Sequence, residues 1–205
     1  MGCIEGRADT EEQLRTAEVE LGFKDIPVDL INTTMRKYSY KSKINQAQLE
    51  RINYQLKLSI TPPNLYVQAF LNSLRKPDGT FSLREFLVLG ILLGKGLPEE
   101  KASIMYQIFD EMLDDSIERN RLTGEVFKTM SKISIEITPH LIRHNNEYIV
   151  KLFEKQSVTI KSIIDRFPEN LIVCSEKDFI KHICFIENGN LLTTSGWRAY
   201  SLTLP

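Results

Sequence analysis

A short cassette recurs along the chain and constrains the fold more than any other feature of the sequence. It consists of an apolar residue, then Ser, Thr or Asn, then an acid or amide, and finally another apolar residue. The copies lie at 44–49, 81–86 and 174–179, with a weaker copy at 122–127. Each predicts a capping box, in which two polar side chains satisfy free N–H groups at the start of a helix.

The spacing of the cassettes predicts an all-α fold. Apolar residues recur at helical intervals nearly everywhere, and no convincing alternating strand is longer than a few residues. A helix, a loop of about a dozen residues and a second helix form the EF-hand unit. We therefore expect four EF-hand helix–loop–helix units in two pairs, with short β-bridges between paired loops. The bridges are expected to join Ile44 to Phe81 and Leu122 to Cys174.

Prolines indicate where the chain divides. Pro62, Pro63 and Pro98 are typical of first helical turns. The predicted parts are an N-terminal extension (1–26), a first EF-hand pair (27–97), a second pair (98–186) and a C-terminal tail (187–205). The tail is expected to leave the helical pattern, with a turn at 188–190 and a loop at 193–196 before the only tryptophan, Trp197. Its apolar residues predict that it lies in the protein's own groove or against a partner.

The most specific signal runs from Asp78 to Asp110, through an apolar stretch and the segment from Gly96 to Lys101. It resembles the junction between the second and third hands of neuronal calcium sensors, calcineurin B and the ciliary protein calaxin. The resemblance implies a cupped apolar surface that receives an amphipathic helix of a larger protein. The residues available for such a groove are Phe70, Phe86, Leu89, Leu92, Leu93, Ile104, Ile108, Phe109 and Met112.

The first two predicted loops are poor calcium sites. A working loop offers oxygen ligands at positions 1, 3 and 5, a bidentate Glu at position 12 and Gly at position 6. Loop 37–48 carries lysines at positions 1 and 5 and ends in Gln48. Loop 74–85 keeps Asp78 and Glu85 but places Lys76 at position 3. These two carboxylates are the only weak metal candidates that we name.

The other two loops are also incomplete. Loop 115–126 ends in Val126, although the acids after Phe109 also suggest an expanded loop with another register. Loop 167–178 begins with Phe167. Because affinity follows ligand charge, we expect no calcium site tighter than ~1 mM and no other cofactor.

The overall charge excludes some classes of partner. The 26 basic and 27 acidic side chains nearly cancel, so no global field recruits nucleic acid or an anionic membrane. Three cysteines without metal-ligand spacing, in a chain with no recognisable secretory signal, predict a reduced, cytoplasmic protein. Gly2 and Cys3 are lipidation candidates, but Gly6 departs from the myristoylation pattern. Nothing resembles a nucleophile with its base, so we expect no enzyme.

The sequence therefore predicts a calcium-independent adaptor or assembly subunit that binds an amphipathic helix. One alternative is a calcium-sensing regulatory subunit that uses the second or third loop. Another is a ciliary or axonemal structural or dynein-docking protein, which the resemblance to calaxin implies together with a cytoskeletal partner. A membrane-anchored regulator is the third alternative and requires acylation of Gly2 and Cys3.

Overall fold

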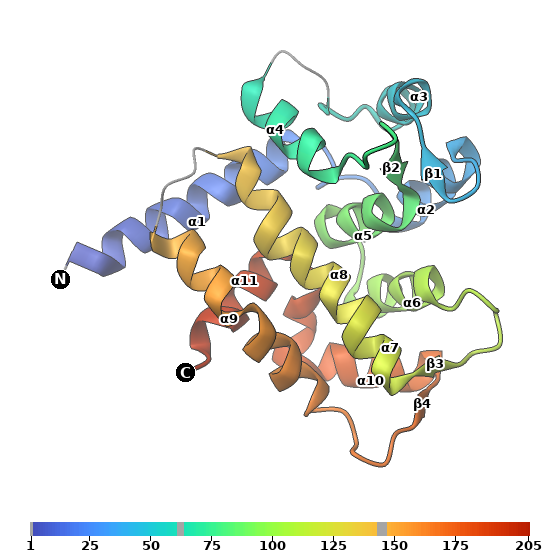
Figure 1. Ribbon diagram of the computed structural model, residues 1–205, viewed down its shortest axis with the longest axis vertical. Helices are drawn as coiled ribbons and strands as arrows, with labels where there is room; N and C mark the ends of the chain where they lie inside the picture. The colour runs from blue at the N-terminus through green and yellow to red at the C-terminus, as the bar shows by residue number, and fades with distance from the viewer. Residues whose placement is uncertain (1, 61–63, 143–146) are drawn as a thin grey trace.

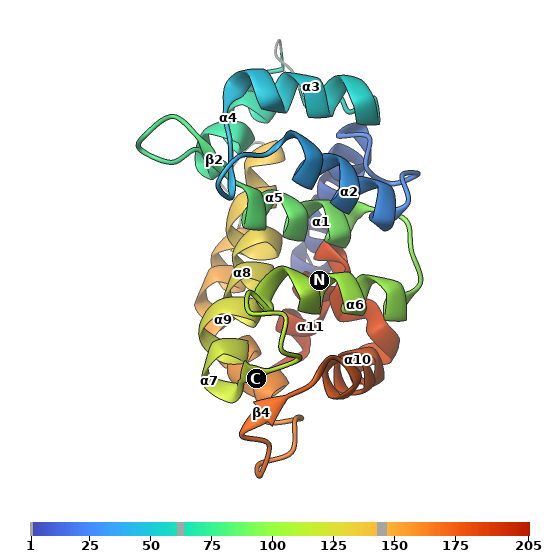
Figure 2. The same ribbon diagram turned by 90° about the vertical axis from the view of Figure 1, so that its right-hand side faces the viewer.

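The computed structural model describes residues 2–60, 64–142 and 147–205, and side chains from residue 10 onward within these ranges. The chain is mainly helical (Figures 1 and 2). Its first half contains α1 (Gly2–Glu20), α2 (Val28–Tyr38), α3 (Gln46–Leu56), α4 (Leu65–Leu74), α5 (Leu83–Leu93) and α6 (Pro98–Phe109). Its second half contains α7 (Arg119–Arg121), η1 (Leu122–Phe127), α8 (Lys128–Ser131), η2 (Lys132–Ile137), η3 (Thr138–Leu141), α9 (Glu147–Ile164), α10 (Glu176–Phe185), η4 (Ile186–Leu192) and α11 (Thr194–Thr203). The all-α prediction is confirmed.

Two short antiparallel bridges join the loops in pairs. β1 (Lys43–Ile44) pairs with β2 (Phe81–Ser82) and places Ile44 opposite Phe81, as predicted. β3 (Ile117–Glu118) pairs with β4 (Val173–Cys174), but the residue opposite Cys174 is Ile117. The predicted partner Leu122 is wrong, since it lies within helix η1.

The wrong register follows from the weak cassette at 122–127. The hydroxyl of Thr123 donates to the carbonyl of Arg119, 3.2 Å away, within a continuing helix. Such a bond to the preceding turn belongs to a helix interior and does not cap a new helix. The other three cassettes do cap helices, because the side chains of Asn45, Ser82 and Ser175 accept from the backbone at the starts of α3, α5 and α10.

The prolines are only partly informative. Pro98 is the first residue of α6, as predicted. Pro62 and Pro63 lie outside the described residues, and α4 begins after Asn64, whose side chain accepts from the N–H of Tyr66.

One long helical stretch runs from residue 119 to 141 through both halves of the molecule (Figure 1). The residues at the junctions of its α and π segments keep right-handed helical backbone angles. Near its start, Phe127 packs against Phe167 and Phe179. Its later part packs against α4 and α5. This stretch therefore joins the two predicted pairs into one apolar core, which also includes Trp197.

The C-terminal tail remains helical. The predicted turn is present, because Glu187, Asn188 and Gly189 all have positive φ angles. The predicted loop at 193–196 is wrong, since the hydroxyl of Thr193 caps α11 by accepting from the N–H of Gly196. Sequence periodicity missed this helix because buried polar residues interrupt its apolar face.

No helix in the described ranges is long and apolar enough to cross a membrane. Gly2 and Cys3 fall in α1, but their side chains lie outside the description, so acylation stays a prediction.

Candidate functional site

The first pair of loops holds its acidic residues with the chain's own lysines. Lys43 Nζ in the first loop lies 2.6 Å from Asp78 Oδ2 in the second. The other oxygen of Asp78 accepts from the N–H and the hydroxyl of Thr80. The bonds from Lys43 and Thr80 hold the pKa of Asp78 well below its usual value. This carboxylate is thus already bound to cationic and N–H groups.

Glu85, the other acidic residue that the sequence named as a weak metal candidate, lies between two ammonium groups. Its Oε2 is 3.0 Å from Lys76 Nζ, and its Oε1 is 2.8 Å from Lys132 Nζ. Burial alone would raise the pKa of Glu85, but the contacts with Lys132 and Lys76 outweigh it and lower the pKa. Lys132 comes from η2, so the loop is tied to the long helical stretch. Lysine side chains here contact the carboxylates that would otherwise be offered to a cation.

The observed bridge residue is Ile117 and not Leu122. Counting the predicted twelve-residue loop from Ile117 as position 8 gives a third loop at 110–121. Asp110 then stands at position 1 and Arg121 at position 12, where calcium binding needs a carboxylate. Arg121 donates to both carboxylate oxygens of Glu125 and to the carbonyl of Phe109. Asp110 is buried, and its Oδ2 accepts from the N–H of Asp115. The third loop therefore carries a guanidinium in place of the last ligand.

An arginine also contacts the carbonyl oxygens at the start of the fourth loop. Arg119 Nη2 is 2.9 Å from the carbonyl of Ile164, and its Nη1 contacts the carbonyl of Pro168. Phe167, at position 1, is buried among other aromatic rings. Within the described parts of the chain, no group of three or more His, Cys, Asp or Glu side chains is arranged to hold a metal ion.

Most of the predicted groove residues lie inside the core. Among those of the first pair, Leu93 is half-buried and the others are fully buried. Their helices, α4 and α5, pack against η2 and η3 of the long stretch. The chain's own helix therefore covers the apolar face on which we placed a partner.

The groove residues of the second pair divide in the same way. Ile104, Ile108 and Phe109 on α6 are buried, whereas Met112 after the helix is 82% exposed. The structure gathers seven of the nine predicted groove residues into one core cluster, packs Leu93 against that cluster and leaves Met112 in solvent.

Helix α11 lies against η2, η4 and α9 (Figures 1 and 2). Its buried side chains fall on one face and include Trp197 and Tyr200. The hydroxyl of Tyr200 shares a hydrogen bond of 2.8 Å with Ser162 on α9. The tail thus packs against η2, η4 and α9 of the protein itself, whereas its predicted position in a groove stays a prediction.

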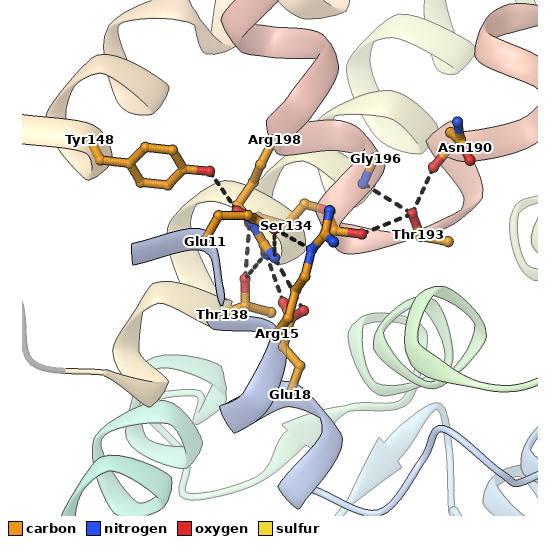
Figure 3. A network of polar contacts seen from close by, with 11 residues as sticks. Glu11, Arg15, Glu18, Ser134, Thr138, Tyr148, Asn190, Thr193, Gly196 and Arg198 are labelled. Atoms are coloured by element: carbon orange, nitrogen blue, oxygen red, sulfur yellow. Dashed lines mark hydrogen bonds and ion pairs between the residues drawn. The ribbon is translucent and has the colours of Figure 1, made fainter. Parts of the chain in front are cut away.

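A buried ion network ties α11 to α1 (Figure 3). Arg198 has no exposed side-chain surface, and its guanidinium binds Glu11 at 2.8 Å and Glu18 at 2.7 Å. Thr138 and the carbonyl of Ser134 accept further hydrogen bonds from it. Burial alone would lower the pKa of Arg198, but the two carboxylates outweigh it and raise the pKa.

Sequence reasoning missed this network. Glu11 and Glu18 lie two turns apart on one face of α1, which is a usable signal only once their partner is known. The partner is 187 residues away from Glu11 along the chain, so no local pattern identifies it.

Comparison of the chain with protein-family models, with curated proteins and with solved structures finds no match.

Proposed function

We propose that the chain is a calcium-independent adaptor of EF-hand type that binds an amphipathic helix of a larger protein. Two features support the EF-hand assignment: loops joined by antiparallel bridges, and capped helices that follow three of the four bridging residues. The observation that carries calcium independence is the contact of Glu85 with both Lys76 and Lys132. Calcium would have to displace two ammonium groups from one carboxylate.

Calorimetric titration with calcium tests this proposal. We expect no saturable heat at micromolar calcium and no change in the emission of Trp197, which is buried in the core. The matched variant is Lys76→Asp combined with Lys132→Met, which removes both ammonium groups and restores an acid at position 3. This variant should gain calcium binding at the weak end of the EF-hand range, ~1 mM. A micromolar isotherm for the unmodified protein would contradict calcium independence.

One observation favours a calcium-sensing alternative in the third loop. Asp110 Oδ1 is buried and makes no hydrogen bond within the described chain. Substituting Asp110→Asn distinguishes the two proposals, because a calcium signal that depends on this loop disappears in that variant. A ciliary or cytoskeletal partner is supported by the resemblance to calaxin alone.

The partner helix is proposed to take the place of α11. This helix presents one buried face, with Trp197 as its largest side chain, as an amphipathic ligand would in a groove. Thr159 Oγ1 on α9 and Ser201 Oγ on α11 lie 3.0 Å apart. Two cysteines at these positions are close enough to form a disulfide that fixes α11 in place.

The double variant Thr159→Cys, Ser201→Cys provides the test. Oxidation should abolish binding of a helical partner isolated with the unmodified protein, and reduction should restore it. Each single cysteine variant serves as a control and should bind in both conditions. Equal binding by the oxidised and reduced double variant would show that α11 stays in place and that the partner docks elsewhere.

A further inference from the structure

A cavity of about 650 Å³ lies between α1, the end of α5 and the start of α11. Its volume is within the range of small-molecule sites. Leu92 and Leu93 line one side, and Val19 on α1 contributes a half-exposed apolar side chain. Thr194 and Ser195 supply hydroxyl and backbone N–H groups from the first turn of α11. The cavity thus combines an apolar wall with hydrogen-bond donors.

A buried ammonium group lines the same cavity. Lys101 is only 6% exposed, and its Nζ lies 3.2 Å from the carbonyl of Leu192 and 3.4 Å from the carbonyl of Leu92. Leu192 is the residue before Thr193, the N-cap of α11, so the first contact places the ammonium group close to the start of that helix. Within the described residues, no carboxylate lies within ion-pair distance of Lys101. Buried lysines are rarely left without an acid, because burial penalises the charge.

The surroundings make this positive charge less favourable still. The first turn of α11 contains no acid and lies beside Lys101, so this helix N-terminus adds partial positive charge, whereas Glu99 and Glu100 offset the N-terminus of α6. The carbonyl of Leu92, in the last turn of α5, offsets only part of this. An anion between Lys101 and the start of α11 would complete the site.

The other charged groups restrict which anion fits. Glu12, Glu18 and Glu20 line the α1 side, while Arg15 and Lys24 supply the other charges. Glu18 is already bound to Arg198. A multiply charged anion would be repelled by the glutamates, whereas a single carboxylate can bind Lys101 and place an aliphatic body on Leu92 and Leu93.

We propose that this cavity binds a small monocarboxylate with an aliphatic chain, with Lys101 and the first turn of α11 holding the carboxylate. This site is independent of calcium, but it includes the first turn of α11, so a partner helix that displaces α11 would remove part of it. The first measurement is titration of the unmodified protein with hexanoate, followed by NMR or calorimetry. Hexanamide has the same shape without the charge, and inorganic phosphate tests a multiply charged anion. We expect saturable binding of hexanoate alone.

Two variants and one control variant test the assignment. Lys101→Met keeps the aliphatic stem and removes the charge, and should weaken hexanoate binding about tenfold or more, since a charge-assisted hydrogen bond is lost. Lys95→Met removes an exposed lysine outside the cavity and should bind as the unmodified protein does. Ser195→Asp places a competing carboxylate in the first turn of α11, where an acid favours the helix, and should abolish hexanoate binding without unfolding the protein.

Several results would overturn the proposal. They are the absence of saturable hexanoate binding by the unmodified protein, equal binding of hexanamide, and unchanged binding by Ser195→Asp. If Lys101→Met does not fold, Ser195→Asp and the hexanamide comparison decide the question without it. Preference for phosphate over hexanoate would also contradict a monocarboxylate site.

Discussion

Two buried cations lie close to α1 and α11, and they differ in the groups that compensate their charge. Arg198 is fully buried and bound by two carboxylates, whereas Lys101 is nearly as buried and, among the residues that the structure describes, its ammonium group contacts two carbonyl oxygens and no carboxylate. A compensated buried charge fixes the packing of the helices around it. An uncompensated one is costly, and such costs are typical of sites that bind a ligand.

Replacing Arg198 should have the largest effect. Arg198→Met leaves Glu11 and Glu18 buried without their partner, so we expect a loss of about 3–5 kcal/mol in the free energy of unfolding. Chemical denaturation measures this loss. Arg15→Met is the control, because Arg15 is exposed and its pair with Glu11 should contribute less than about 1 kcal/mol. Similar stability of Arg198→Met and the unmodified protein would mean that the network does not hold α11 in place.

The lowered pKa of Lys101 should make the free energy of unfolding depend on pH. Burial lowers its pKa to about 8 from 10.5. The unfolded chain therefore keeps this proton at pH values where the folded chain has released it, and stability rises as pH increases through this window. The gain should be on the order of 3 kcal/mol. Denaturation of the unmodified protein and of Lys101→Met at pH 7.5 and pH 10 isolates this contribution, which the variant should lack. Equal pH profiles would mean that Lys101 is well solvated.

Glu85 is an intermediate case, because it is buried but is shared by two lysines whose own side chains are partly exposed. Glu85→Gln should cost about 1 kcal/mol, since Lys76 and Lys132 can turn towards solvent once the carboxylate is lost. Thermal melting checks this value. A loss as large as that of Arg198→Met would place Glu85 among the fully buried pairs.

The exposed pair of Lys43 and Asp78 should matter least. Solvent and salt screen both groups, so Lys43→Met should leave the unfolding midpoint nearly unchanged at physiological ionic strength. Melting curves at low and high salt test this prediction. A clear stabilisation that persists in high salt would show that the first two loops depend on this contact.

Local chemistry explains what could be predicted from the sequence. The caps at Asn45, Ser82 and Ser175 depend on residues three positions apart, and the bridge of Ile44 with Phe81 follows from the positions of two such caps. The predicted register of the third loop was wrong because Thr123 belongs to a continuing helix. The sequence pattern alone does not distinguish such a position from a helix start.

Tertiary packing explains what could not be predicted. An apolar face such as that of Leu89 has the same sequence whether a partner or the chain's own helix covers it. The ion pairs of Arg198 and the contact of Lys101 with Leu192 join segments that are far apart in the chain. The cavity beside Lys101 is lined by α1, α5, α6 and α11, which are far apart in the chain, so no local sequence pattern predicts it.

The helical stretch from 119 to 141 should determine how the molecule unfolds. It carries side chains into both predicted pairs, so neither pair keeps its interior when the other loses structure. Melting should therefore occur in a single cooperative transition with no half-folded species, as expected of one folding unit and not of two independent lobes.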